Sequence, residues 1–210
     1  MLRVNDIFYT IQGEGYHAGT PSIFVRLEGC NLTCNFCDTE FNSGEPRPEK
    51  WMLKEIKKKG GDCKFIVLTG GEPSMQDIQE FVKVVKDAGY YIMIESNGMY
   101  ELPKNPALDW VCVSPKINTQ SKKLVVREAD EYKFVVPYDG KLPNTKGLKS
   151  DHFWISPENE TAINKDRGIK VGDRGCSQVN LAATKYCVNL IKDNPKFKLN
   201  LQMHKFIGVE

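Results

Sequence analysis

The feature that most constrains this chain is a group of three cysteines in the stretch EGCNLTCNFCDT, residues 28–39. Cys30, Cys34 and Cys37 follow the spacing C-x3-C-x2-C. Thiolates so close together repel one another and are open to oxidation unless a soft metal or an iron–sulfur cluster binds them. A closed structural site takes four protein ligands, so three cysteines predict a site with one metal position left for a ligand that is not protein.

A structural zinc site is the second interpretation of the same cysteines. Its fourth ligand would lie elsewhere in the chain, and Cys63, Cys176 and His204 could supply it. The protein would then be a non-enzymatic zinc-binding interaction protein. The cysteines number seven, and those outside the group are scattered, which does not suggest a disulfide framework and favours a reducing, cytoplasmic location.

Length and charge set the class of protein. The 210 residues, of which 40% are hydrophobic and 27% charged, are typical of a globular chain, and we expect one domain over residues 1–210. The net charge of +2 indicates no nucleic-acid partner. No apolar run approaches the roughly 18 residues of a membrane span, so we expect no membrane association.

Alternating strand and helix patterns predict an α/β fold. Helices are expected over residues 48–59, over residues 74–88, with Ser74 and Asp77 as a capping box, and over residues 178–192. A strand should open the chain at residues 2–11, and alternation from Phe197 to Met203 predicts a final one. The apolar runs between them predict strands at 22–27, 64–68, 90–95, 109–113, 131–136 and 152–155. We interpret the pattern as an incomplete, TIM-like β/α barrel of about six parallel strands with few helices.

Polar motifs follow these strands at the point where each one ends. They read QGEG (12–15), TGGEP (69–73), ESNG (95–98), SPK (114–116) and SPEN (156–159), in addition to the cysteine loop. The carboxyl ends of parallel strands meet at one rim, where ligands bind in α/β folds. The sequence therefore predicts one binding site at this rim.

The cysteine spacing, with Phe36 before the third cysteine and Asp38 after it, resembles the cluster loop of the radical S-adenosylmethionine (SAM) superfamily. The resemblance implies a 4Fe–4S cluster, one per chain, whose unique iron takes the amino and carboxylate groups of SAM. TGGEP resembles the GGEP motif of that superfamily, in which the backbone meets the amino group of SAM.

A narrower resemblance covers the whole chain. The opening IQGEG, then FVRLEGCNLTCNFCDT, TGGEP, ESNG, VSPK and the tail QMHKFIGVE are together similar to the 7-carboxy-7-deazaguanine synthases of queuosine biosynthesis. These enzymes are carbon–nitrogen lyases that convert 6-carboxy-5,6,7,8-tetrahydropterin to 7-carboxy-7-deazaguanine with loss of ammonia. The resemblance also implies Mg²⁺, an external reductant such as flavodoxin or ferredoxin, and a homodimer.

Carried onto this sequence, the resemblance names the site residues. The three cysteines would hold the cluster and Thr39 would help bind Mg²⁺, while no side chain is assigned as a catalytic group because the radical comes from SAM. The residues implied in SAM binding are Phe36, Cys37, Asp38, Gly71, Glu72, Glu95, Ser114, Pro115, Lys116, Ser156, Pro157, Glu158 and Asn159. The residues implied in pterin binding are Ile11, Gln12, Gly13, Arg26, Thr69 and Glu210; Glu14 is added on its chemistry, because a carboxylate can accept pterin N–H groups.

Departures from the family pattern leave an alternative open. SPEN replaces a Gln-Pro-Met-Asp-like run, QMHK replaces Gln-Thr-His-Lys, and Glu210 stands where proline is frequent. His204 could equally cap the core or belong to the site. Activating enzymes of glycyl-radical enzymes also carry C-x3-C-x2-C, and they act on a protein partner. IQGEG and Arg26 instead suit a small anionic ligand.

Overall fold

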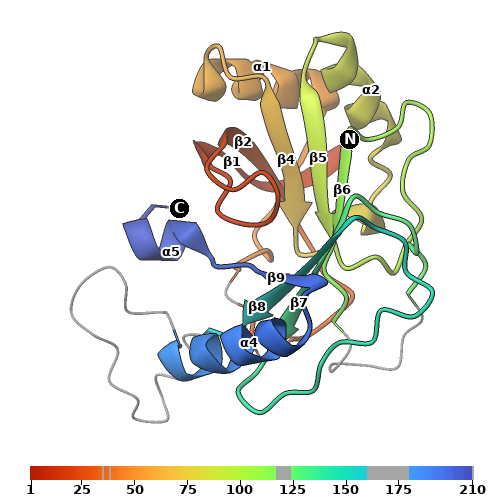
Figure 1. The fold of residues 1–210 in the computed structure, drawn as a ribbon. Coiled ribbons are helices and arrows are strands. Elements are labelled where there is room, and N and C mark those ends of the chain that lie inside the picture. Colours follow the sequence, from red (N-terminus) through yellow and green to blue (C-terminus); the bar gives the residue numbers. More distant parts are fainter. Residues whose placement is uncertain (35, 38, 117–123, 160–179, 210) are drawn as a thin grey trace.

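The computed structural model describes residues 1–34, 36–37, 39–116, 124–159 and 180–209, which form a nine-stranded sheet with a few helices (Figure 1). The strands are β1 (Leu2–Ile11), β2 (Pro21–Leu27), β3 (Glu45–Arg47), β4 (Phe65–Gly70), β5 (Tyr91–Ser96), β6 (Trp110–Val113), β7 (Glu131–Val136), β8 (His152–Pro157) and β9 (Phe197–Leu199). The helices are α1 (Glu49–Gly60), the 3-10 turn η1 (Pro73–Met75), α2 (Gln79–Asp87), α4 (Leu181–Asp193) and α5 (Met203–Ile207).

The sheet is a partial barrel. Its strand order is β3-β1-β2-β4-β5-β6-β7-β8-β9, so β3 and β9 form the two edges. Every neighbouring pair from β2 to β9 is parallel, whereas β1 is antiparallel to both β2 and β3. The predicted α/β class and the incomplete barrel of parallel strands are confirmed, with the short β9 extending the run.

Helices cover the outer face of this sheet at two places. Met52 and Ile56 of α1 and Phe81 of α2 are fully buried against one cluster, which the outward-facing side chains of β1, β2, β4 and β5 complete. Cys187 of α4 belongs to a second cluster over β7, β8 and β9. Each large apolar side chain buried in this way contributes about 1.5–3 kcal/mol, which fixes the helices on the sheet and leaves the inner face for other groups.

The inner face of the central strands is layered from one end to the other. Alternate residues of a strand point to the same face, so each strand places an aromatic residue first, an apolar non-aromatic one next and a polar one last. The residues are Phe65, Val67 and Thr69 on β4; Tyr91, Met93 and Glu95 on β5; and Trp110, Cys112 and Ser114 on and just after β6. The middle residues form a dry layer between an aromatic end and a polar end.

The expected helix over residues 74–88 is wrong in its first third. Pro73–Met75 form the 3-10 turn η1, and α2 begins at Gln79, after Ile78 as N-cap. Ser74 does not cap α2, because its backbone N–H and its hydroxyl both donate to the buried carboxylate of Glu72. The strong hydrogen bonds of a buried carboxylate therefore override the capping pattern.

The ends of the chain differ from expectation in two further places. The alternation after Phe197 forms strand only to Leu199, and Met203 begins α5 because its N–H donates to the carbonyl of Gly13, 2.9 Å away. The edge strand β3 was not predicted. The expected helices over 48–59 and 178–192 correspond to α1 and α4; residues 178 and 179 lie outside the described ranges.

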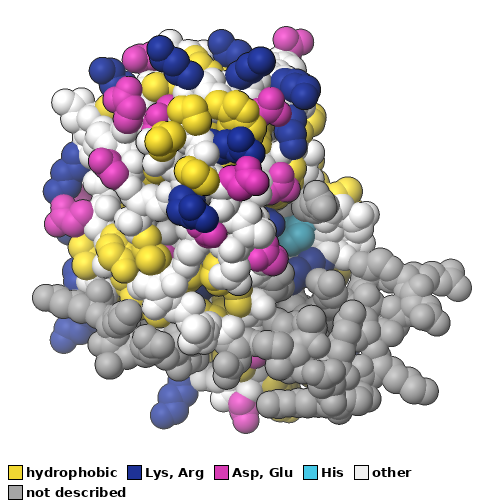
Figure 2. All heavy atoms as spheres, turned by 180° about the vertical axis from the view of Figure 1, so that it is seen from behind, with side chains coloured by type: hydrophobic (Ala, Val, Ile, Leu, Met, Phe, Trp, Pro, Cys, Tyr) yellow, Lys and Arg dark blue, Asp and Glu magenta, His cyan; other side chains and the backbone are white. Residues whose placement is uncertain are grey.

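The surface carries charges of both signs. Figure 2, which shows the face turned away from the viewer in Figure 1, has basic and acidic side chains interspersed with scattered hydrophobic ones. Within the ranges that the structure describes, none of the helices combines the length and the apolar character needed to cross a membrane.

Candidate active site

A cavity of about 580 Å³ lies over the carboxyl ends of the parallel strands. Residues of the QGEG loop, the cysteine loop, TGGEP, ESNG, SPK and SPEN all line it. The prediction that these motifs share one rim is therefore confirmed. The C-terminal segment joins them through Gln202, His204 and Lys205.

Most of the residues expected at the site line this cavity: Ile11, Gln12, Gly13, Glu14, Arg26, Cys30, Cys34, Phe36, Cys37, Thr39, Thr69, Gly71, Glu95, Ser114, Lys116, Ser156, Pro157 and Asn159. Glu72, Pro115 and Glu158 are described but are not among the lining residues. Asp38 and Glu210 lie outside the described residues.

The cysteine loop rests directly on the TGGEP turn. The N–H of Glu72 donates to the carbonyl of Gly29, 2.8 Å away. A Cβ atom on Gly71 would stand 2.2 Å from that carbonyl oxygen and 2.8 Å from the Cβ of Cys30, so only glycine permits this approach. The close approach of Gly71 to Gly29 therefore joins the TGGEP turn to the cysteine loop, two motifs about 40 residues apart in the sequence.

Two further contacts fix the cysteine loop from the neighbouring strand ends. The side-chain amide of Asn97, in ESNG, donates to Asn31 at 2.8 Å. The ammonium of Lys116, in SPK, lies 5.6 Å from the centre of the Phe36 ring, a cation–π contact. The loop is thus tied to β4, β5 and β6 at once.

The three thiols share one wall of the cavity. Cys30 and Cys34 are half-buried, and Cys37 is exposed with its sulfur 3.8 Å from the carbonyl of Thr39. Burial raises the pKa of the Cys30 thiol, and the nearby Glu72, Cys34 and Cys37 raise it further. Among the described residues, no group of three His, Cys, Asp or Glu side chains is already arranged to hold a metal ion. The donor set, with three soft sulfur ligands facing one cavity, suits an iron–sulfur cluster with an open iron.

The carboxylate of Glu72 has a structural role. It is fully buried, and it accepts hydrogen bonds from the hydroxyl of Ser96 at 2.8 Å and from the N–H of Asn97 at 2.6 Å. These contacts join the TGGEP turn to the ESNG turn. The side chain of Glu72 is therefore used within the protein.

Arg26 carries a donor that the protein leaves unused. Its guanidinium lies 5.0 Å from the centre of the Phe8 ring, and its buried Nε has no hydrogen-bond partner in the described part of the chain. A buried polar group without a partner is costly. Because the guanidinium fork matches a carboxylate, Arg26 is suited to an anionic ligand.

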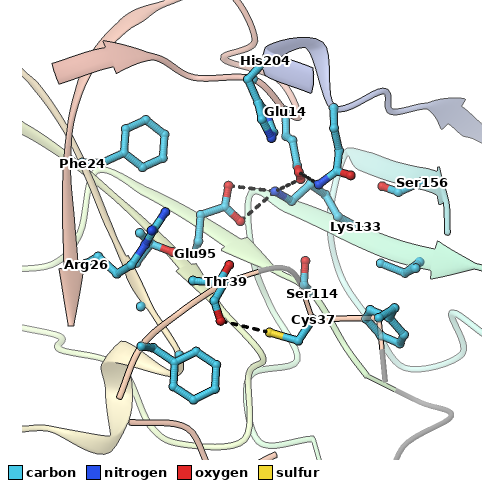
Figure 3. A pocket seen from close by; sticks show the side chains of 18 of the residues that line it. Glu14, Phe24, Arg26, Cys37, Thr39, Glu95, Ser114, Lys133, Ser156 and His204 are labelled. Atoms are coloured by element: carbon cyan, nitrogen blue, oxygen red, sulfur yellow. Dashed lines mark hydrogen bonds and ion pairs between the residues drawn. The ribbon is translucent and has the colours of Figure 1, made fainter. Parts of the chain in front are cut away.

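Three charged side chains that line the cavity, Glu14, Glu95 and Lys133, point toward one another (Figure 3). The ammonium of Lys133 lies 2.8 Å from a carboxylate oxygen of Glu14 and 2.8 Å from one of Glu95. Burial tends to raise the pKa of Glu14, but Lys133, Gln202 and His204 lower it to about 2. For Glu95 burial prevails and raises the pKa, with Lys133 opposing that rise.

Contacts from distant strands hold the QGEG loop. The N–H of Tyr16 donates to Glu131 at 2.9 Å, and the N–H of Gly15 donates to Asn200 at 2.7 Å. His204 packs on the same loop so closely that a Cβ on Gly13 would stand 2.0 Å from its Nδ1. His204 thus lines the cavity and also closes it over the loop.

Sequence reasoning gave no role to the side chains of Lys133, Asn97, Asn200 or Gln202, although Asn97 lies in ESNG and Gln202 in QMHK. For Lys133 there was a signal in the strand EYKFVV, because a lysine at an inward-facing position of a buried parallel strand needs a partner there. The other three act through long-range hydrogen bonds, for which the local pattern carries no signal.

Comparisons with known proteins agree with this geometry. Residues 24–133 match the Radical SAM superfamily. The 7-carboxy-7-deazaguanine synthase of Bacteroides thetaiotaomicron is 37% identical over 100% of this chain and 99% of its own length. The enzyme of the same name from Burkholderia multivorans is 34% identical over 98% of each chain.

A solved structure shows the same fold. The crystal structure of QueE from Escherichia coli superimposes with a TM-score of 0.70 and 24% sequence identity, covering 97% of this chain and 94% of its own. The sequence relatives, which match from end to end, decide the narrower assignment. The chain belongs to the Radical SAM superfamily and, within it, to the family of 7-carboxy-7-deazaguanine synthases.

Proposed function

We propose that the protein converts 6-carboxy-5,6,7,8-tetrahydropterin to 7-carboxy-7-deazaguanine with loss of ammonia, as a lyase of queuosine biosynthesis. One observation carries the proposal. The cysteine loop and the guanidinium of Arg26 open into the same cavity, in a chain whose relatives are named for this product. A cluster site alone would fit many reactions, whereas an anion site beside it suits a carboxylated substrate.

The cluster would be bound by Cys30, Cys34 and Cys37. Bound there and reduced, the cluster would supply the electron for reductive cleavage of SAM and so the radical chemistry that starts at C6 of the pterin. The protein binds, orients and shields both ligands. Lys116 and Phe36, which are in contact, stand beside the cluster loop where SAM would approach.

SAM contacts would come from the strand ends. Gly71, Ser114, Ser156, Pro157 and Asn159 line the cavity, with Glu158 assigned to the SAM site beside them, and Glu95 offers a carboxylate to the ribose hydroxyls. The backbone at Glu72 and Pro115, together with Asp38, completes this proposed set. Asn159 binds Gln202 and the N–H of Asn180 within the protein, so its backbone rather than its amide is the group left for SAM.

The pterin would be held between two charged ends of the cavity. Arg26 binds its carboxylate, while Glu14 accepts its ring N–H groups and the backbone of Ile11, Gln12 and Gly13 borders the ring. Thr69 contacts the substrate from β4, and Glu210 is assigned to the substrate site from the family resemblance. A ligand with a carboxylate at one end and N–H donors at the other can therefore bind in one orientation only, with its carboxylate toward Arg26 and its donors toward Glu14.

Further components complete the proposal. Thr39 would supply an oxygen ligand to Mg²⁺, a hard cation that prefers oxygen ligands. An external protein such as a flavodoxin or ferredoxin reduces the cluster, SAM is regenerated after each turnover, and the enzyme works as a homodimer in the cytoplasm. The family assignment disfavours both an activating enzyme of a glycyl-radical enzyme and a zinc-binding interaction protein.

The test is a product assay under anaerobic conditions. Protein reconstituted with iron and sulfide is reduced and incubated with SAM, Mg²⁺ and 6-carboxy-5,6,7,8-tetrahydropterin, and 7-carboxy-7-deazaguanine and ammonia are quantified. We expect many product molecules per SAM consumed, and less product when Mg²⁺ is omitted. SAM cleavage without any deazaguanine product would refute the substrate, and a colourless, iron-free protein that carries zinc would refute the whole proposal.

A further inference from the structure

Lys133 is a buried cation that the proposed function does not use. It lies in the middle of β7, and its side chain is only 5% exposed. Removing an ammonium from water is costly unless anions surround it. A strand that faced a purely apolar interior would not carry this residue, so its partners should explain its presence.

The partners of Lys133 are two carboxylates from different parts of the chain. Glu14 comes from the QGEG loop after β1, and Glu95 stands near the end of β5; each has an oxygen 2.8 Å from the lysine Nζ (Figure 3). Both carboxylates line the cavity. The lysine therefore bridges two elements that are distant in the sequence and that both contribute side chains to the cavity.

Each carboxylate also accepts a hydrogen bond from a side-chain amide. The amide of Gln202 donates to the other oxygen of Glu14 at 2.8 Å, and the amide of Gln12 donates to Glu95 at 3.2 Å. The side chains are thus held in single orientations rather than free to follow a ligand. The other ionisable groups that face this cluster are Cys112 on β6, Glu131 on β7 and His204 on α5.

We propose that Lys133 is a positioning residue that couples the SAM site to the pterin site by binding Glu95 and Glu14 at the same time. The inference rests on the proposed function, in which Glu95 meets the SAM ribose and Glu14 meets the pterin. Lys133 keeps both groups aimed into the cavity and favours their ionised forms. Whichever ligand binds first, the carboxylate that meets the other ligand is therefore already in place.

The charge balance of the cluster explains why one lysine serves two carboxylates. One cation and two anions leave a net negative charge in this part of the cavity, which Arg26 also lines with an unused donor. The field suits a ligand whose carboxylate points to Arg26 and whose N–H groups point to Glu14. Without Lys133 the two buried carboxylates would repel each other, and one would take up a proton.

Loss of Lys133 should therefore have a signature in pH. Burial without the ammonium raises the pKa values of Glu14 and Glu95, so the deprotonated forms that accept hydrogen bonds become scarcer as the pH falls. A purely structural loss would instead weaken binding equally at every pH. The distinction can be measured as ligand binding, without turnover.

The experiment uses the reconstituted, unreduced holoenzyme and its variants Lys133→Met and Lys133→Arg. Dissociation constants for SAM and for 6-carboxy-5,6,7,8-tetrahydropterin are measured by equilibrium dialysis from pH 6 to pH 8. We expect Lys133→Met to weaken both ligands by about tenfold or more, with the larger loss at low pH, since a charge-assisted contact is lost at each site. Lys133→Arg, which keeps the charge, should restore most of the affinity.

Phe134→Leu is the matched control, because Phe134 lies on the same strand, is buried in the outer cluster and points away from the cavity. It should lower stability and leave both dissociation constants unchanged. Equal behaviour of Phe134→Leu and Lys133→Met, or an effect of Lys133→Met on one ligand alone, would overturn the proposal.

A cross-comparison covers the case in which Lys133→Met does not fold. If the lysine couples the sites, Glu14→Gln should change the affinity for SAM and Glu95→Gln the affinity for the pterin; strictly local effects would overturn the coupling. Failure of the proposed function looks different. The wild-type protein would then form no deazaguanine product. The effects of Lys133→Met and Glu14→Gln on the dissociation constant for SAM could still be measured, because that measurement needs no turnover.

Discussion

The two ends of the inner face of the sheet differ in how their buried polar atoms are accommodated. At the carboxyl ends of the strands, Lys133, Glu14 and Glu95 form a closed set of ion pairs. At the other end, aromatic rings stack on one another: Tyr16 lies 4.8 Å from Trp110 and Phe65 lies 4.9 Å from Tyr91, centre to centre. The same strands supply both ends.

The aromatic end leaves ring nitrogens without partners. Nε2 of His17, Nδ1 of His152 and Nε1 of Trp154 are buried, with no hydrogen-bond partner among the described residues. Burial lowers the pKa of His17, which favours its neutral form. In the polar end, Arg26 Nε alone of the described lining side chains has this property. The unpartnered Nε of Arg26 lies in a ligand-sized cavity lined by ion pairs, so it points to a ligand. The unpartnered ring nitrogens lie among stacked aromatic rings, and we attribute them to packing.

The largest expected effect on activity comes from replacing a cysteine at the polar end of the inner face. Cys34→Ala should abolish the cluster and reduce product formation by about a thousandfold or more, because two thiolates cannot replace three ligands. Iron content and product yield are the measurements. Cys63→Ala is the control, since Cys63 contacts the carbonyl of Pro21 outside the cavity; if it also lost the iron, the assignment of three cluster ligands would be wrong.

At the aromatic end the expected loss is one of stability. Phe65→Ala removes the ring that stacks on Tyr91 and contacts His17, and we expect it to cost about 2–3 kcal/mol of unfolding free energy and lower the melting temperature by about 8 °C. The rate per folded molecule should stay within about twofold. A matching fall in kcat at a temperature well below the transition would show that the two ends are not separable.

A change at Arg26 should act on binding rather than on folding. Arg26→Lys keeps the charge but loses the planar fork, so we expect KM for the pterin to rise about thirtyfold, equivalent to about 2 kcal/mol, with little change in melting temperature. Steady-state kinetics and calorimetry separate the two. Arg47→Lys, which alters a guanidinium stacked 4.4 Å over Trp51 instead, is the control and should leave KM unchanged.

The smallest expected effect is a pH dependence at Glu14. Its pKa falls from 4.5 to about 2 on folding, so its stabilising contribution is complete well above 4.5 and is lost as the pH falls toward 2. The stability advantage of the wild type over Glu14→Gln should therefore shrink by about 0.4 kcal/mol between pH 6 and pH 4.5. Anaerobic denaturant titrations at the two pH values measure it, and an advantage that grew on acidification would contradict the sign.

Much of this architecture could be predicted from local pattern. Continuous apolar runs predict the buried parallel strands, as residues 64–68 did for β4. The polar motifs that follow these runs predict the position of the binding rim. What failed depended on distant partners. Ser74 followed the capping pattern but donates to the buried Glu72, and Met203 continued an alternation but binds Gly13. Lys133 was visible as an unusual residue, yet its meaning required Glu14, which is 119 positions away.

The contact between Gly71 and Gly29 limits how this protein could be rebuilt. The two backbones approach so closely that no side chain fits between them, and the N–H of Glu72 joins them with a hydrogen bond. A cysteine loop transplanted into another barrel would need this turn as its seat, and a loop changed in length here would lose it. The unit that can be exchanged between proteins is thus a pair of distant segments rather than the cysteine motif by itself.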